Sequence, residues 1–195
     1  MDFLSQIDMA LFEILSGNCE LWSVFIWVGI ICAKFLIYIL PLHLCALWFC
    51  GGYRERQVTL SICISICIAL LVGYLISCIY FRPRPFVTYL EPPLIKHQAT
   101  ASFPSNHALV VSAYMSSLYF YRYKTASRFA LILLCLVCWG RVFTGVHYPF
   151  DVLVGSILGG LVSWVVSRFI ASYFPDFLYH IPPLKYNLKT GIRFK

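Results

Sequence analysis

The sequence is dominated by apolar stretches long enough to cross a lipid bilayer. A membrane-spanning helix needs about 20 predominantly apolar residues. Stretches of this kind lie at 21–50, 58–80, 106–121 and 150–174, and a fifth at 126–143 forms an inward and outward pair with the third. Of the 195 residues only 12% are charged, whereas soluble domains carry about 25%. We therefore predict an all-α, polytopic membrane helix bundle, folded as a single domain over 1–195 with its core at 58–174.

The number of crossings depends on the first apolar stretch. Residues 21–50 are too many for one straight crossing, and they include Lys34 and Pro41. They fit either a tilted, kinked helix or a short half-helix followed by a span at 35–50, so five or six crossings are predicted. Because a lysine at mid-bilayer costs several kcal/mol, Lys34 is expected either to extend to the interface or to face protein.

Residues 3–16 precede the first span and have a helical pattern of their own. Phe3, Ile7, Leu11, Ile14 and Leu15 recur near helical spacing, and the acidic residues lie opposite them. This pattern predicts a short N-terminal amphipathic helix that lies on the membrane surface.

The net charge of +7 is distributed as in a membrane protein rather than in a nucleic-acid-binding one. Basic residues gather at 54–56, at 122–128 and in a tail at 175–195, whereas the first twenty residues contain four acids and no lysine or arginine. The positive-inside rule therefore places the tail in the cytoplasm and the N-terminus, 81–104 and 144–149 outside. No nucleic-acid-binding module is recognisable, so no nucleic-acid partner is predicted.

Three polar motifs lie at the ends of predicted spans on this outer side. The first reads FRPRPF at 81–86, the second SFPSNHA at 102–108 and the third GRVFTGVHYPFD at 140–151. The two spans between the second and third motifs run inward and return. We therefore expect all three motifs to meet at one membrane interface.

The residue types in the first two motifs suit the transfer of a phosphoryl group. Such a group spreads negative charge over its oxygens, and catalysis consists mainly of positioning and electrostatic stabilisation. Arg84, together with Arg141 of the third motif, offers planar, charged forks that bind phosphate bidentately. Ser105 occupies a helix N-cap position, so the amides of Asn106 and His107 are expected to face an anion. His107 could donate a proton to the leaving oxygen.

The third motif has the spacing of a nucleophile and its orienting carboxylate. Pro149 is favoured at the first position of a helix, which places Asp151 in the first turn. Asp151 can then reach one imidazole nitrogen of His147 and leave the other free to attack phosphorus. Taken alone, each motif could be a helix cap, an interfacial anchor or a local turn pair. Their combination at one depth favours catalysis.

Other functional classes fit the residues less well. An anionic-lipid or phosphate transporter could use the same basic face, but the sequence shows no internal repeat. An inactive scaffold would not need His107, His147 and Asp151 together. No cofactor and no metal is predicted, because arginines and helix amides supply the positive charge and the outer loops between spans, with the motifs at their ends, offer only Glu91 and Asp151 as carboxylates.

At these residues the chain resembles the type 2 phosphatidic acid phosphatase superfamily of membrane lipid phosphatases. The family pattern is Lys-x6-Arg-Pro, then Pro-Ser-Gly-His, then Ser-Arg-x5-His-x3-Asp. The matching residues, within about 58–170, are Arg84-Pro85, Pro104-Ser105-Asn106-His107 and Arg141-x5-His147-x3-Asp151. The resemblance implies a phosphohistidine on His147, supported by Asp151, with His107 as the acid and with Arg84, Arg141 and Ser105 on the phosphate.

The chain departs from the family pattern at three positions. Ser77 stands in the place of the lysine, so we expect Arg82 or Lys96 to supply that phosphate contact or the contact to be missing. Asn106 replaces a glycine, tolerates unusual backbone angles and could add a hydrogen bond to the phosphate. Gly140 replaces the serine before Arg141, which removes a hydroxyl from the site.

Within the superfamily the FRPRPF segment and the missing lysine are similar to bacterial undecaprenyl-diphosphate phosphatases. That likeness implies hydrolysis of undecaprenyl diphosphate to undecaprenyl phosphate and phosphate, which recycles the cell-wall lipid carrier. It also implies a place in the bacterial cytoplasmic (inner) membrane with the active site facing the periplasm or cell exterior. Phosphatidylglycerophosphate, phosphatidate and lipid A remain alternative substrates, as does phosphotransfer to another lipid. The oligomeric state is not predicted.

Overall fold

The computed structural model describes residues 3–17, 23–89 and 92–173, and within these it consists of helices and loops without strands. The helices are α1 (Phe3–Leu15), α2 (Ser23–Lys34), the short 3₁₀ helix η1 (Leu36–Tyr38), α3 (Ile39–Cys50), α4 (Tyr53–Ile79), α5 (Pro85–Thr88), α6 (Asn106–Phe120), α7 (Lys124–Phe143) and α8 (Pro149–Tyr173). The predicted all-α bundle is confirmed. The predicted basic tail at 175–195 lies outside the described residues.

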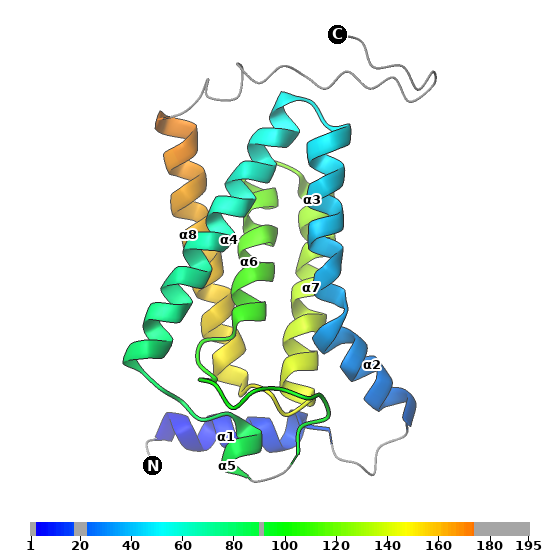
Figure 1. Cartoon of the computed structure of the whole chain (residues 1–195), viewed down its shortest axis with the longest axis vertical. Coiled ribbons are helices and arrows are strands. Elements are labelled where there is room, and N and C mark those ends of the chain that lie inside the picture. Colours follow the sequence, from blue (N-terminus) through cyan, green and yellow to red (C-terminus); the bar gives the residue numbers. More distant parts are fainter. Residues whose placement is uncertain (1–2, 18–22, 90–91, 174–195) are drawn as a thin grey trace.

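The long helices run side by side, with α6 among α4, α7 and α8 (Figure 1). In the described part of the chain, four segments are long and apolar enough to cross a membrane: α2 with α3, then α4, α7 and α8 up to Ile170. The 15 residues of α6 span about 22 Å at 1.5 Å per residue, which is less than a bilayer core of about 30 Å. The predicted count of five or six crossings therefore stays a prediction.

The first predicted span is a kinked helix. It bends between α2 and α3, where η1 interrupts the α-helical pattern (Figure 1). Pro41 lies in the first turn of α3, where its missing N–H leaves the carbonyl of Ile37 without an α-helical partner. Lys34 is the last residue of α2 and is exposed beside the ring of Phe35, so it does not face the protein interior.

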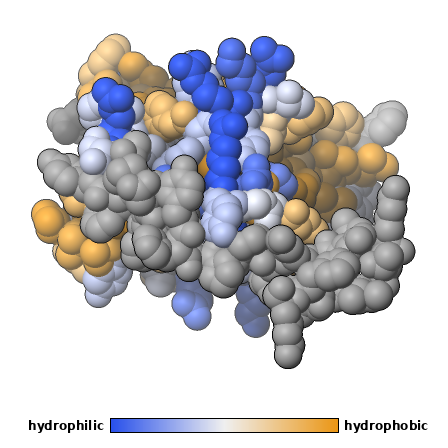
Figure 2. Space-filling model, turned by 90° about the horizontal axis from the view of Figure 1, so that it is seen from above, coloured by the Kyte–Doolittle hydropathy of each residue, from blue (hydrophilic) through white to orange (hydrophobic). Residues whose placement is uncertain are grey.

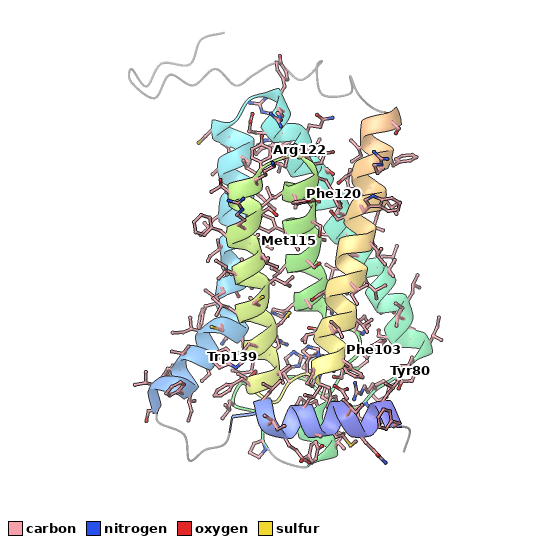
Figure 3. All side chains as sticks on the ribbon, turned by 180° about the vertical axis from the view of Figure 1, so that it is seen from behind. Tyr80, Phe103, Met115, Phe120, Arg122 and Trp139 are labelled. Atoms are coloured by element: carbon pink, nitrogen blue, oxygen red, sulfur yellow. The ribbon has the colours of Figure 1, made fainter. Side chains whose placement is uncertain are left out.

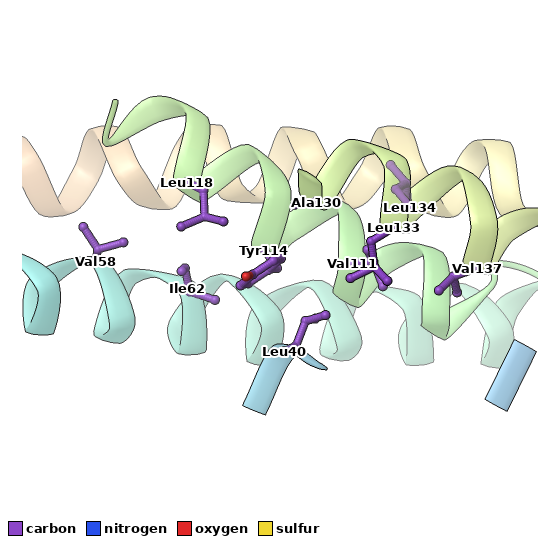
Figure 4. Close-up of a cluster of buried hydrophobic side chains, with 10 residues drawn as sticks. All are labelled: Leu40, Val58, Ile62, Val111, Tyr114, Leu118, Ala130, Leu133, Leu134 and Val137. Carbon is purple, nitrogen blue, oxygen red and sulfur yellow. The ribbon is translucent and has the colours of Figure 1, made fainter. Parts of the chain in front are cut away.

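A core of apolar side chains joins α3, α4, α6 and α7 (Figure 4). Its buried members are Leu40, Val58, Ile62, Val111, Tyr114, Leu118, Ala130, Leu133, Leu134 and Val137. On the other side of α6, Gly155 and Gly159 bring α8 into close contact. A side-chain carbon at Gly155 would lie within 3 Å of the backbone of Ser105, just before α6, and one at Gly159 within 3 Å of the backbone of Leu109 in α6. Tight packing on both sides fixes where the ends of α6 lie.

The two ends of the bundle differ in character. Figure 2 views the end opposite α1, where hydrophilic residues group between apolar flanks. Figure 3 shows Arg122 and Phe120 at that end, and Tyr80, Phe103 and Trp139 near α1. Bulky residues such as Phe25, Leu71 and Phe169 are exposed along the sides, as expected for surfaces that face lipid. The protein is thus a multi-pass membrane protein with chemically distinct ends.

Helix α1 lies across one end of the bundle, beside α5 (Figure 1). The predicted N-terminal helix is confirmed, and its apolar residues Phe3, Leu11 and Ile14 are exposed. Asp8, one of the acids placed opposite these apolar residues, has a buried side chain. Because Phe12 packs against the rings of Tyr89 and Tyr148, α1 is part of the bundle rather than a separate anchor.

Candidate active site

The three polar motifs meet at the end of the bundle that α1 covers. Arg84 precedes α5, Ser105 precedes α6, Arg141 lies in the last turn of α7, and His147 and Asp151 lie on either side of the start of α8. In Figure 1 the corresponding ends of α6, α7 and α8 lie together. The expected convergence is therefore present in the tertiary structure.

Arg84 is clamped in the loop between α4 and α6. Its guanidinium donates to the carbonyls of Thr100 (3.1 Å) and Ala101 (2.9 Å), to the hydroxyl of Thr100 (3.2 Å) and to the carbonyl of Val146 (3.0 Å). Nη1 also lies 3.2 Å from Nε2 of His147. Burial lowers the pKa of Arg84 to about 10, against the opposing effect of Asp151, so this side chain stays charged at neutral pH and faces the imidazole.

His147 is buried between Arg84 and Asp151. Its side chain is 3% exposed, and Nδ1 lies 3.6 Å from Oδ2 of Asp151. Burial lowers the pKa of His147 to about 4, although the nearby carboxylate of Asp151 opposes this effect. The imidazole is therefore neutral at pH 7, which is the form that can act as a nucleophile. The turn before His147 needs Gly145, whose φ of 76° is costly for other residues.

Asp151 is held on all sides within the first turn of α8. Its carboxylate accepts hydrogen bonds from the Ser102 hydroxyl, from the Tyr148 amide (2.9 Å) and from Nη1 of Arg82 (2.8 Å). These bonds restrict how the carboxylate can turn relative to His147. The contribution of Ser102 was not recognised from the sequence, although this residue lies in the second motif.

Arg141 reaches the site from the end of α7. Its side chain is buried, Nη1 lies 3.4 Å from the carbonyl of Ala33 in α2, and Nε has no hydrogen-bond partner. Gly140 is needed here, because a Cβ atom would lie 2.6 Å from the backbone nitrogen of Ala33. The close approach of α2 therefore explains why glycine stands where the family pattern has serine.

Ser105 and His107 lie at the start of α6. Ser105 occupies the predicted N-cap position, but its side chain makes no capping bond and its buried Oγ has no hydrogen-bond partner. Its N–H instead donates to the carbonyl of Asp151 (3.0 Å). His107 is partly buried in the first turn, close enough to Arg141 and His147 to interact with them electrostatically. An unsatisfied hydroxyl and an imidazole thus lie where an anion would bind.

The expected roles at the departures from the family pattern need revision. Arg82 pairs with Asp8 and Asp151, Lys96 is exposed, and the Ser77 hydroxyl donates to the carbonyl of Tyr74. Arg82 is therefore engaged by carboxylates rather than held free for phosphate. Asn106 is exposed and begins α6. In the described part of the chain only Arg122 among non-glycine residues has a positive φ, so the tolerance of asparagine for unusual backbone angles is not used here.

The described residues contain no group of three or more His, Cys, Asp or Glu side chains that could hold a metal ion. The charged and titratable groups near His147 are instead the guanidinium groups of Arg84 and Arg141, the carboxylate of Asp151 and the imidazole of His107. This donor set suits a phosphate group, whose charge the guanidinium groups can balance. The absence of a cofactor from the reaction stays a prediction.

Comparison with known proteins agrees with this arrangement. The chain is 32% identical over 166 residues to the undecaprenyl-diphosphatase BcrC of Bacillus subtilis, covering 84% of each protein. Two crystal structures share its fold: LpxE of Aquifex aeolicus (TM-score 0.66, 18% identity, 83% of this chain and 95% of that one) and a transmembrane PAP2 type phosphatidylglycerolphosphate phosphatase of Bacillus subtilis (TM-score 0.65, 21% identity, 89% of each chain). Residues 58–174 match the PAP2 superfamily, and the chain belongs to that superfamily.

Proposed function

We propose that this protein is a membrane lipid phosphatase that converts undecaprenyl diphosphate to undecaprenyl phosphate and inorganic phosphate. The observation that carries the proposal is the placement of His147, which is buried with Nδ1 toward Asp151 and Nε2 toward Arg84. Membership of the PAP2 superfamily and the name of the Bacillus subtilis relative support a lipid diphosphate as the substrate.

The first step forms a phosphohistidine. Nε2 of His147 attacks the terminal phosphorus, the bond between that phosphorus and the bridging oxygen breaks, and His107 in its protonated form gives its proton to the departing lipid phosphate. Arg141 and the Ser105 hydroxyl bind the oxygens of the group in transfer, where negative charge accumulates. Arg84 turns to these oxygens the Nη1 hydrogen that faces Nε2 of His147 before the attack. Asp151 stabilises the imidazole while it carries the phosphoryl group.

The second step releases phosphate and restores the enzyme. A water molecule attacks the phosphohistidine, His107 takes the proton from that water, and the N–P bond breaks to return neutral His147. The net change is one water consumed, with one lipid monophosphate and one orthophosphate formed. Phosphotransfer would differ only in the acceptor, because a lipid hydroxyl or phosphate would replace water.

The orientation of the site belongs to the same proposal. Basic residues such as Arg54, Arg122 and Lys124 lie near the α3–α4 and α6–α7 turns, at the end opposite α1. The positive-inside rule assigns this end to the cytoplasm, so the active site faces the periplasm or cell exterior. We further propose that the membrane is the bacterial cytoplasmic membrane, where a polyprenyl diphosphate is presented at the outer surface.

The test is phosphate release from a panel of purified lipids by the full chain in detergent, with EDTA present. We expect release from undecaprenyl diphosphate to exceed release from phosphatidylglycerophosphate, phosphatidate and lipid A. His147→Ala should abolish it, while His43→Gln, whose side chain contacts Tyr114 in the bundle, should retain it. Undiminished release by His147→Ala would overturn the mechanism, and preference for another lipid would overturn the substrate. A requirement for a divalent ion would contradict the metal-free scheme.

A further inference from the structure

The N-terminal helix contributes a buried carboxylate to the active-site end of the bundle. The side chain of Asp8 is 1% exposed, although neighbouring residues of α1 such as Leu4 and Leu11 are exposed. A buried charge is costly unless it is paired and hydrogen-bonded. Asp8 lies outside residues 58–174, the part of the chain that matches the superfamily. Its burial therefore calls for an explanation specific to this chain.

Both oxygens of Asp8 contact the segments that form the site. Oδ2 lies 2.7 Å from Nη2 of Arg82, in the loop that also positions Arg84. Oδ1 accepts a hydrogen bond of 2.9 Å from the amide of Phe150, in the first turn of α8. Asp8 thus connects α1 to the loop before α5 and to the start of α8.

Arg82 connects Asp8 to Asp151. Its Nη1 lies 2.8 Å from Oδ1 of Asp151, while its guanidinium carbon lies 3.9 Å from the centre of the Tyr148 ring. Phe12 of α1 packs against the same ring. The guanidinium is therefore fixed by a carboxylate at each end and an aromatic ring, an arrangement that leaves it little freedom to move.

We propose that Asp8 is a positioning residue for the phosphatase reaction, acting through Arg82 to hold Asp151 against His147. Oδ1 of Asp151 is held by Arg82, and Oδ2 is the oxygen that lies 3.6 Å from Nδ1 of His147. When Asp8 loses its charge, Arg82 has one carboxylate partner instead of two and can move with Asp151. The imidazole then loses a fixed orienting group. This inference rests on the proposed function.

The variant that isolates this role is Asp8→Asn. It removes the charge but keeps an oxygen that can accept from the Phe150 amide, so the start of α8 retains its partner. We expect kcat to fall about 10-fold, because displacing a catalytic group by a fraction of an ångström has effects of this order. KM should stay within about two-fold, since Arg84 and Arg141 are unchanged. Glu13→Gln, an exposed acid of the same helix, is the matched control and should leave both constants unchanged.

A double-mutant cycle separates positioning from a general loss of folded protein. Arg82→Gln should lower kcat at least as much as Asp8→Asn, and adding Asp8→Asn to it should cause no further loss. A merely structural defect would instead lower kcat again in the Arg82→Gln background. The inference would be overturned if Asp8→Asn left kcat unchanged, or if the two substitutions lowered kcat independently in the cycle. In either case an active wild-type protein would still support the proposed function. An inactive wild type would overturn both.

Discussion

Nη1 of Arg84 lies 3.2 Å from Nε2 of His147. A guanidinium can only donate hydrogen bonds, so Nε2 must accept and cannot carry a proton. The proton of the neutral imidazole then resides on Nδ1, which lies on the side of Asp151. This one contact therefore assigns the tautomer in which the electron pair of Nε2 is unprotonated, as a nucleophile requires.

The first prediction concerns the pH dependence of turnover. Because burial lowers the pKa of His147 to about 4, the imidazole stays unprotonated well below its usual pKa of about 6.5. The acid limb of kcat/KM, which reports the free enzyme, should therefore have its midpoint below 6.5. The measurement is phosphate release between pH 3.5 and 8. A midpoint at or above 6.5 would show that the imidazole is not buried in this way.

The same shift affects stability. Between pH 6.5 and about 4 the unfolded chain takes up a proton on His147 that the folded chain does not. The contribution of His147 to the free energy of unfolding should therefore be complete above pH 6.5, and the free energy of unfolding should decrease as the pH falls from 6.5 to about 4. His147→Gln should remove that part of the dependence, as measured by denaturation in detergent.

The second prediction concerns the clamp on Arg84. Its guanidinium donates to three carbonyls and one hydroxyl, and a lysine ammonium cannot reproduce this fork. Arg84→Lys should lower kcat/KM at least about 100-fold, which is the effect of removing one hydrogen-bond donor that stabilises the negative charge of a transition state. Arg54→Lys changes an exposed arginine that binds the Tyr121 carbonyl, and it should be nearly neutral. Equal activity of the two variants would argue against phosphate binding by Arg84.

The third prediction separates activity from stability at the start of α6. The Oγ of Ser105 is buried without a hydrogen-bond partner, so Ser105→Ala should not reduce the free energy of unfolding. Turnover should nevertheless fall about 10-fold or more, because the hydroxyl is available for a phosphate oxygen.

Ser112→Ala provides the opposite control. The Ser112 hydroxyl donates to the carbonyl of Ser156, and its loss should cost about 1 kcal/mol of stability with turnover retained. Thermal unfolding and phosphate release would be measured on both proteins. Full activity of Ser105→Ala would show that this hydroxyl does not contact the substrate.

The fourth prediction concerns the contact between α6 and α8. A Cβ atom on Gly159 would lie 2.4 Å from the carbonyl oxygen of Leu109, whereas one on Gly160 would meet nothing closer than the Ser116 hydroxyl at 3.4 Å. Gly159→Ala should therefore cost about 1–3 kcal/mol of stability and lower activity by moving the start of α6. Gly160→Ala should be tolerated. Similar melting temperatures for the two variants would contradict the close packing.

Several features of the fold and site could be predicted from local sequence. The apolar stretches predicted the bundle, and Ser105 and Pro149 marked the starts of α6 and α8. The kinked helix over 21–50 was one of two alternatives, the other being a half-helix followed by a separate span. Pro41 restricts the backbone angles around it but does not show at which turn the helix bends. The stretch at 106–121 predicted the bounds of α6 to within one residue, but its apolar content did not show that a helix of this length is shorter than the bilayer core.

The sequence alone determined which polar motifs are present and which segments form helices in the membrane, because hydrophobic periodicity and helix caps are local properties. It did not specify which charge pairs with which. Arg82 and Asp151 are 69 positions apart, and Asp8 is separated from Phe150 by 142. Folding of α1 across the bundle brought these residues together, and because a buried charge is costly unless it is paired, burial there requires the Asp8–Arg82–Asp151 connection. The role of Arg82 was thus settled by long-range packing, which no local pattern encodes.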